Sequence, residues 1–415
     1  MHNSGIGGGG EGTGEGRALG FCISRASGGW VRCVRRTELA HIKIMSTDVW
    51  ARRNPIQPVP RLPSGSKERF VDDYLNPALP VVLEGHARDW PAFARWDFSF
   101  LVSECGDDPV LLMLDGDRSN GSRRQSTVAD FIHSFRPRDV IDLSDTDEAT
   151  STGFGGGLGT ACPADQAASV PYLREWAFAK RHPELLADCS PHAEHFFADG
   201  FKALPEDQRP PLIWLFVGPG GTYTPLHKDL WNTDAWIAQI RGRKLCRLWH
   251  PDDAPTLSRG DSFVDFSRGD SVAAYPGCEA CGCLEAILEP GDVLYVPSNW
   301  LHEVIALEDS ISVSSNFMGA PRAHLVRPHH DEWLARRAVS REIESVTKRL
   351  RAIASVEALR DGGMDSSDEE DGGTTGTRAL SGAQQTLLAE KPGLESRLQK
   401  LKALPKLGGW TPTTL

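Results

Sequence analysis

The stretch Glu289-Pro-Gly-Asp-Val-Leu-Tyr-Val-Pro297 is a turn followed by a short strand with little polarity. Pro-Gly is a typical centre of a tight turn, and a brief apolar run that ends at proline is typical of a buried strand. The same pattern recurs over residues 211–317, where apolar runs alternate with Gly, Pro and Asp turn signals. We therefore predict strands at residues 212–217, 235–240, 244–249, 286–288, 293–296 and 310–317. This spacing is typical of a sandwich or small barrel such as a jelly roll.

Segments of other kinds flank this all-β region. The folded domain is expected over residues 61–320, and its first part should contain a buried strand near residues 80–83, another at 110–114 and a short helix at 128–135. Residues 1–60 are expected to form a disordered glycine-rich leader, and residues 142–168 a low-complexity insertion. After the domain we expect a helical segment at 321–360, an acidic linker at 361–378 and a weakly helical tail at 379–415.

Composition sets limits on the class of protein. The chain has 415 residues, 40% of them apolar, and 45 basic against 56 acidic residues give a net charge of −11. A general nucleic-acid-coating protein needs a basic face, so nucleic acid remains possible as a partner but is not indicated by this charge. No apolar run approaches the roughly 18 residues needed to cross a membrane. We expect a soluble protein of the cytoplasm or the nucleus, whose nine cysteines are reduced thiols.

The segment Gly220-Gly-Thr-Tyr-Thr-Pro-Leu-His-Lys-Asp229 holds the most informative chemistry. In an extended strand alternate side chains point the same way, so His227 and Asp229 would face one interior point. His302 follows 75 residues after His227. Two histidines and one carboxylate on a β scaffold are the ligand set of non-haem Fe(II) oxygenases, which leaves part of the coordination sphere open. The pattern therefore favours a metal site formed by His227, Asp229 and His302.

An acidic co-substrate on such a metal needs a buried cation at its far end, because an unpaired buried carboxylate is costly. In the run Arg243 to Trp249, Lys244 shares a face with the apolar Cys246 and Leu248, so the lysine points inward. Thr224 would add a hydroxyl donor. On the last predicted strand, Asn316 would reach the carboxylate on the metal side.

Taken together, these segments resemble the JmjC-domain family of Fe(II)- and 2-oxoglutarate-dependent oxygenases, and within it the branch of asparaginyl and lysyl protein hydroxylases. The motifs that carry the resemblance are TPLHKD, WIAQIRGRK, EPGDVLYVPSNWLHEV and SISVSSNF, with PALPVVLEGHARDWPAF and VPYLREWAF upstream. The resemblance spans about residues 60 to 320.

What the resemblance implies is a mainly β fold, a double-stranded β-helix of the jelly-roll, cupin-like type, with flanking and C-terminal helices. It implies iron held by His227, Asp229 and His302, and 2-oxoglutarate held by Lys244, Thr224 and Tyr172, with O2 as the other co-substrate. The implied activity is hydroxylation of a lysine, asparagine or arginine side chain in a protein, with release of succinate and CO2.

Several alternatives stay open at this point. The same chemistry would serve an N-methyl-lysine demethylase or a tRNA nucleoside hydroxylase, and the same barrel would serve a non-catalytic binding module or a sugar-modifying cupin with another metal. Cys278, Cys281 and Cys283 would either bind zinc or form a loop of reduced thiols, and the latter is favoured because their spacing fixes no fourth ligand. The apolar stripe from Ile343 to Ile353 would either pack against the barrel or form a homodimer seam.

Overall fold

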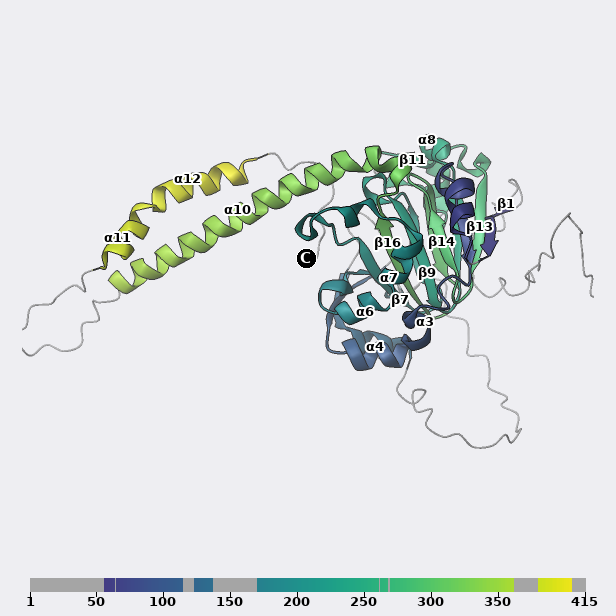
Figure 1. Ribbon diagram of the computed structural model, residues 1–415, viewed down its shortest axis with the longest axis horizontal. Coiled ribbons are helices and arrows are strands. Elements are labelled where there is room, and N and C mark those ends of the chain that lie inside the picture. Colours follow the sequence, from purple (N-terminus) through teal and green to yellow (C-terminus); the bar gives the residue numbers. More distant parts are fainter. Residues whose placement is uncertain are drawn as a thin grey trace, which may run out of the picture. The chain divides into compact units, whose positions relative to one another are not determined.

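The computed structural model describes residues 56–63, 65–114, 123–136, 170–260, 262–267, 269–361 and 380–404 (Figure 1). All described residues belong to one compact unit. The predicted leader up to residue 55, the insertion at 142–168 and most of the acidic linker lie outside the described residues.

Two β-sheets form the core of the described domain, and they confirm the predicted cupin-like fold class. The five-stranded sheet has the order β1 (Ile56–Pro58), β13 (Cys283–Leu288), β10 (Lys244–Trp249), β15 (Leu301–Ala306) and β8 (Tyr223–His227). The seven-stranded sheet has the order β2 (Arg61–Pro63), β3 (Val81–Glu84), β14 (Val293–Val296), β9 (Asp234–Arg241), β16 (Ser310–Phe317), β7 (Ile213–Gly218) and β6 (Leu173–Trp176). Each of the six predicted strands of the all-β region corresponds to one of these.

The sheet begins earlier in the chain than the predicted boundary at residue 61. Strand β1 pairs in parallel with β13, and the Val59 N–H donates to the Glu285 carbonyl at 3.0 Å. Residues 56–60 therefore belong to the folded domain, and the predicted leader is too long by these residues. The prolines at 58 and 60 argued against a strand at the sequence level, because proline interrupts the hydrogen bonding of a central strand. An edge strand tolerates proline, and β1 is an edge strand.

A tight turn between β9 and β10 fixes where β10 begins. Gly242 has a φ of +66°, and a Cβ at this position would lie 2.1 Å from the Asp309 carbonyl oxygen. The Gln239 side-chain amide donates to the carbonyl oxygens of Arg241 (2.7 Å) and Gly242 (2.9 Å). The turn delivers Lys244 as the first residue of β10, with its side chain buried as the alternation predicted.

Helices pack on the outer face of the seven-stranded sheet around a large apolar cluster that includes Trp96, Phe131 and Phe178. They are α2 (Lys67–Phe70), α3 (Pro91–Arg95), α4 (Phe98–Cys105), α5 (Val128–Phe135), α6 (Pro183–Ala187) and α7 (Ser190–Phe196). Further short strands and α-helices of the domain are β4 (Pro109–Met113), β5 (Arg123–Thr127), β11 (Ser258–Arg259), β12 (Ser262–Phe263), α8 (Ala254–Leu257) and α9 (Gly269–Ala274). The predicted strand at 110–114 and helix at 128–135 are confirmed by β4 and α5.

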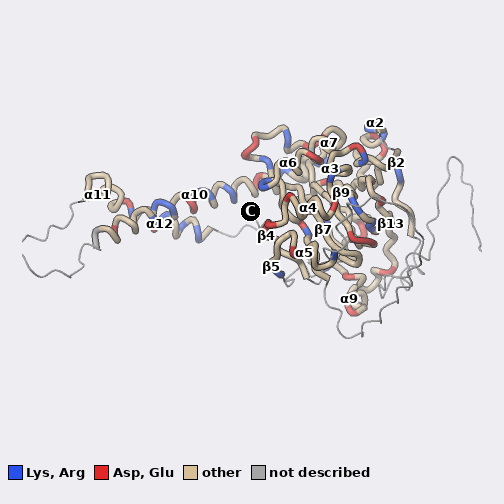
Figure 2. Tube along the Cα trace, turned by 90° about the horizontal axis from the view of Figure 1, so that it is seen from below, with Lys and Arg blue, Asp and Glu red and all other residues tan. Residues whose placement is uncertain are grey.

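Three helices follow the barrel: α10 (Ala323–Asp361), α11 (Gly382–Ala389) and α12 (Lys391–Lys402). Val346 and Ile353 of the predicted stripe are buried, and α12 packs along α10. Three ion pairs join them at 2.5–2.7 Å, namely Arg349–Glu390, Lys391–Glu357 and Arg397–Glu342, and opposite charges lie side by side along this hairpin (Figure 2). Homodimerisation through these helices stays a prediction. Within the described ranges, no helix combines the length and the apolar character that a membrane span requires.

Candidate active site

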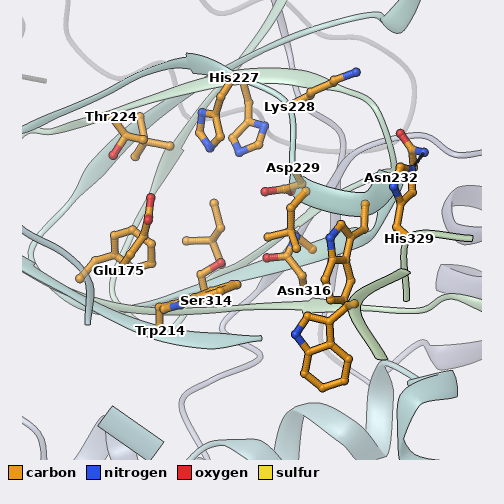
Figure 3. A pocket seen from close by; sticks show the side chains of 18 of the residues that line it. Glu175, Trp214, Thr224, His227, Lys228, Asp229, Asn232, Ser314, Asn316 and His329 are labelled. Atoms are coloured by element: carbon orange, nitrogen blue, oxygen red, sulfur yellow. Dashed lines mark hydrogen bonds between the residues drawn. The ribbon is translucent and has the colours of Figure 1, made fainter. Parts of the chain in front are cut away.

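A cavity of about 880 Å³ opens between the two sheets, and it brings all the predicted site residues together (Figure 3). Its lining includes Thr224 of β8, Lys244 of β10 and His302 of β15 from the five-stranded sheet. Ile237 of β9 and Asn316 of β16 line it from the seven-stranded sheet. Tyr172, His227 and Asp229 complete the predicted set.

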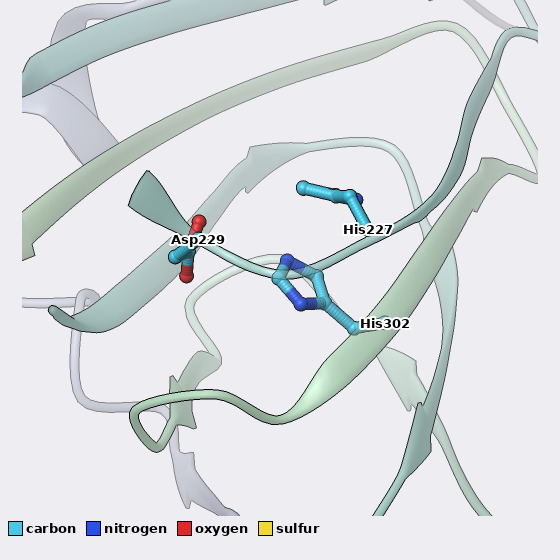
Figure 4. Close-up of side chains that lie close together, drawn as sticks. All are labelled: His227, Asp229 and His302. Carbon is cyan, nitrogen blue, oxygen red and sulfur yellow. The ribbon is translucent and has the colours of Figure 1, made fainter. Parts of the chain in front are cut away.

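The two histidines are direct neighbours across a pair of strands. His227 ends β8 and lies opposite His302 of β15 in antiparallel register, with ring centroids 4.0 Å apart. Asp229 follows in extended conformation (φ −66°, ψ 157°) just before the short helical turn η7 (Leu230–Asn232). One ligand atom from each of the three side chains lies within 4.8 Å of the other two (Figure 4). The side chains of His227 and Asp229 therefore face the same point, as strand alternation predicted, although Asp229 lies two residues after the end of β8.

Backbone carbonyl groups determine the tautomer of both imidazole rings. The Nδ1 atom of His227 lies 2.9 Å from the Pro225 carbonyl oxygen, and that of His302 lies 3.3 Å from the Trp300 carbonyl oxygen. A carbonyl accepts only, so these contacts assign the proton to Nδ1 and the lone pair to Nε2. Such a bond to the outer nitrogen is the usual way in which a protein orients a metal-binding histidine.

Asp229 supplies the charge that the two imidazoles lack. Its Oδ2 is buried and has no hydrogen-bond partner among the described residues. Burial raises the pKa of Asp229, while His302 and a hydrogen bond from Asn316 act in the opposite direction. An orphaned carboxylate oxygen beside two nitrogen ligands fits a divalent cation, and this donor set with open positions fits Fe(II).

The other end of the cavity carries a buried cation. Lys244 is 2% exposed, and its Nζ donates to the Tyr172 hydroxyl at 3.1 Å. The same Nζ lies 5.7 Å from the ring centroid of Tyr172 and 5.6 Å from that of Phe216. No carboxylate in the described part of the chain pairs with Lys244. This end of the cavity fits the carboxylate of an acidic ligand, since buried charges are costly without a partner.

Asn316 interacts with Asp229, one of the three predicted metal ligands. Its Nδ2 donates to the Thr233 hydroxyl at 2.9 Å, and the same side chain acts to lower the pKa of Asp229. Thr224 is 8% exposed and lies on β8 three residues before His227. Both side chains therefore line the cavity, and their roles there stay predictions.

A buried ionic cluster holds the segment that carries Asp229. Asp234 accepts hydrogen bonds from Tyr295, from the Ser298 N–H and from Arg322 at 2.8–3.1 Å. Its side chain joins strands β9 and β14 to the segment after β16. It supports the site without lining the cavity.

Sequence reasoning missed part of the cavity wall. Glu175, in a β-bulge of β6, lines the cavity with φ +61°. The first half of α10 adds His329, Trp333 and Arg336, and His329 Nε2 lies 3.1 Å from the Asn232 amide nitrogen. Trp214 of β7 also lines the cavity. The only sequence signal for Glu175 was its place in the upstream motif with Tyr172.

The cysteine cluster is not part of a metal site within the described residues. Cys278, Cys281 and Cys283 are buried, reduced thiols in a separate apolar cluster. Burial raises the pKa of all three, to about 11 for Cys281, so they remain protonated at neutral pH. The prediction of reduced thiols holds for them, and His227, Asp229 and His302 are the metal-binding group found in the described chain.

A comparison with protein families matches residues 67–322 to the cupin-like domain. Among curated proteins, the chain is 30% identical to "Lysine-specific demethylase 8" of Danio rerio over 63% of this chain and 58% of that protein. It is 24% identical to "Arginine-specific demethylase JMJ20" of Arabidopsis thaliana over 60% of this chain and 54% of that protein. It is 29% identical to "2-oxoglutarate and iron-dependent oxygenase JMJD4" of Danio rerio over 42% of each. The chain thus spans about half the length of these relatives.

Proposed function

Because the chain belongs to the cupin-like domain family, we propose that it is an Fe(II)- and 2-oxoglutarate-dependent oxygenase that hydroxylates a protein side chain. One observation carries this proposal: three ligand side chains converge in the same cavity as a buried lysine that no described carboxylate neutralises. The names of three relatives, two demethylases and one 2-oxoglutarate- and iron-dependent oxygenase, agree with it.

The metal would be held by His227, Asp229 and His302. When bound, Fe(II) with 2-oxoglutarate and O2 supplies the oxidant that inserts one oxygen atom into a C–H bond, and the co-substrate leaves as succinate and CO2. The hydrogen bonds at both Nδ1 atoms keep the ring lone pairs directed at the metal position. Asn316 holds the Asp229 carboxylate from the opposite sheet.

The co-substrate would be held by Lys244, with Tyr172 and Thr224 beside it. An ammonium group and a phenol hydroxyl 3.1 Å apart offer two donors to one carboxylate. The apolar walls formed by Phe216, Ile237 and Val304 exclude water from the space between the carboxylate end and the metal end. Excluding water strengthens these charge interactions and limits unproductive oxidation.

N-methyl-group removal is the second candidate activity, and the names of two relatives favour it. It uses the same site, because a hydroxylated N-methyl group is unstable and leaves as formaldehyde. Mass spectrometry of a modified protein separates the two activities: hydroxylation adds one oxygen atom, whereas demethylation removes one methylene unit. We further propose residence in the cytoplasm or nucleus, since the reduced cysteines of the described chain suit a reducing compartment.

The test is conversion of labelled 2-oxoglutarate to labelled succinate by the purified protein with Fe(II) and ascorbate. The wild-type protein should form succinate, and His302→Ala and Lys244→Ala should each abolish the conversion. Equal conversion by the wild type and by either variant would refute the site assignment. Metal binding without any conversion, even with added protein extracts, would favour a non-catalytic or sugar-modifying cupin.

A further inference from the structure

We propose that the cavity accepts a cationic side chain of the substrate protein and that Glu175 is the carboxylate that pairs with it. This inference rests on the proposed oxygenase function and narrows its substrate class to lysine, arginine or their N-methylated forms. It excludes a neutral asparagine. Four features of the cavity support it: the direction of Glu175, its backbone strain, the balance of charge and the aromatic walls.

The first feature is where the Glu175 side chain points. Its carboxylate is directed into the cavity, toward the space beside Thr224 and His227 (Figure 3). It lies three residues after Tyr172, so one segment lines both the co-substrate end and the approach to the metal. The proximity also registers electrostatically, because the negative charge of Glu175 contributes to the raised pKa of Asp229.

The second feature is the strained backbone that directs the side chain. Glu175 has φ +61°, a region that non-glycine residues rarely adopt, and it lies where the pairing of β6 with β7 shifts register. Such strain costs of the order of 1 kcal/mol and tends to persist where function requires it. Trp231 and Asn232, on the far side of the metal ligands, also have positive φ values of 56° and 55°.

The third feature is the balance of charge once the site is loaded. A divalent metal, the Asp229 carboxylate, doubly charged 2-oxoglutarate and the Lys244 ammonium together carry no net charge. Of the other charged residues in the lining, Glu332 forms an ion pair with Arg336, Arg337 donates to the Asp207 carbonyl oxygen, and the Lys228 ammonium group points away from the cavity (Figure 3). Glu175 therefore remains as the carboxylate for which none of these groups supplies a cation.

Arg174 is the one described cation in contact with Glu175. Its Nε lies 3.3 Å from Oε1, but the pair does not meet hydrogen-bond geometry, and the Nε has no hydrogen-bond partner in the described structure. Glu175 lines the cavity whereas Arg174 does not, and the Glu175 side chain is 52% exposed. The carboxylate therefore keeps lone pairs for an incoming donor.

The fourth feature is the aromatic wall. Trp214 and Trp231 line the same cavity, and Trp333 of α10 lies 5.9 Å from Trp231 between ring centroids. Indole faces attract ammonium and guanidinium groups and also pack against the alkyl stem of lysine or arginine. A carboxylate with aromatic walls is a suitable environment for a long cationic side chain, whereas a short amide would leave Glu175 unpaired.

The test measures peptide binding to the full-length protein loaded with Mn(II) and 2-oxoglutarate under argon. The probes are fluorescent peptide pools, randomised except for a central lysine, arginine, asparagine or norleucine, and the readout is fluorescence anisotropy. The wild type should bind a cationic pool at least about tenfold more tightly than the asparagine and norleucine pools. Glu175→Gln should reduce this preference to less than about twofold, and Glu175→Asp should retain part of it.

Glu332→Gln is the matched control, because it neutralises the carboxylate of the cavity lining that is neither Glu175 nor the predicted metal ligand Asp229, and it should leave the cation preference intact. Two results would overturn the inference: a wild type without preference for cationic pools, or a Glu175→Gln variant that keeps the preference. Calorimetry of 2-oxoglutarate binding in the same samples distinguishes a failure of cation recognition by Glu175 from a failure of the proposed oxygenase function. Normal co-substrate binding without cation preference refutes the recognition role alone, whereas absent co-substrate binding refutes the oxygenase.

Discussion

Replacement of Lys244 by methionine should separate stability from co-substrate binding. The change keeps the length and most of the volume of the side chain but removes the ammonium group. Lys244 is 2% exposed and has a neutral phenol as its hydrogen-bond partner. The folded protein without its co-substrate therefore carries a buried charge with poor compensation, and the variant does not.

The two effects should have opposite signs. Loss of the unpaired buried charge should leave the free energy of unfolding unchanged or raise it by about 1–3 kcal/mol. Loss of the cation that pairs with a buried carboxylate should cost about 3–5 kcal/mol of binding free energy, because the carboxylate is then buried alone. That range corresponds to a decrease in 2-oxoglutarate affinity between about 100-fold and a few thousandfold.

Calorimetric titration of 2-oxoglutarate into the Mn(II)-loaded protein under argon measures the affinity, and urea unfolding of the unloaded protein measures the stability. Lys228→Met is the matched control, since Lys228 also lines the cavity but its ammonium group points away from it (Figure 3). The control should change the affinity less than about threefold. Unchanged binding by Lys244→Met, or a large loss of stability, would refute the assignment of Lys244 as the co-substrate cation.

Three further predictions concern stability, each measured by urea unfolding. Burial lowers the pKa of His86 from 6.5 to about 4, so stability should fall as pH falls across that range, by no more than about 2 kcal/mol, and His86→Phe should abolish this loss. Parallel pH profiles for the two proteins would contradict it. Gly242→Ala should cost about 2 kcal/mol or more, because it combines positive φ with a clash at Asp309, whereas Gly260→Ala, with open space, should cost about half as much. Equal costs would show that the clash is relieved. Glu175→Gly should stabilise the protein by up to about 1 kcal/mol by relieving its positive φ, and a marked destabilisation would make the carboxylate structural.

The sequence predicted those parts of the fold in which one face of a strand is apolar. Lys244, Cys246 and Leu248 were assigned to one face because side chains alternate in a strand, and all three are buried toward the interior. The same rule placed His227 beside Asp229. In both cases the alternation of side chains along one segment was sufficient to predict which side chains face the interior.

Strand β15 was not predicted, although it carries His302, because charged residues interrupt its apolar pattern. Glu303 is 1% exposed, and it accepts hydrogen bonds from the Tyr223 hydroxyl at 2.8 Å and from Arg247 at 3.3 Å. Partners from β8 and β10 satisfy the buried carboxylate. Only the sheet brings these residues together, so sequence alone could not show that a charged position here is interior.

The missed part of the cavity wall has similar causes. Glu175 depends on a register shift between two strands, and a bulge of this kind leaves no periodic signal. The α10 side chains His329 and Trp333 depend on how that helix packs against the turn after Asp229. The site could therefore be predicted as a set of ligands but not as a shaped cavity.

The most direct test of the central claim is anaerobic titration of Fe(II) into the metal-free protein with and without 2-oxoglutarate. The structure predicts one Fe(II) per chain, with tighter binding in the presence of 2-oxoglutarate and a visible charge-transfer band from the chelated co-substrate. His302→Ala should lose both the metal binding and the band. Retention of full iron affinity by His302→Ala, or iron binding that is indifferent to 2-oxoglutarate, would contradict a metal site built on His227, Asp229 and His302.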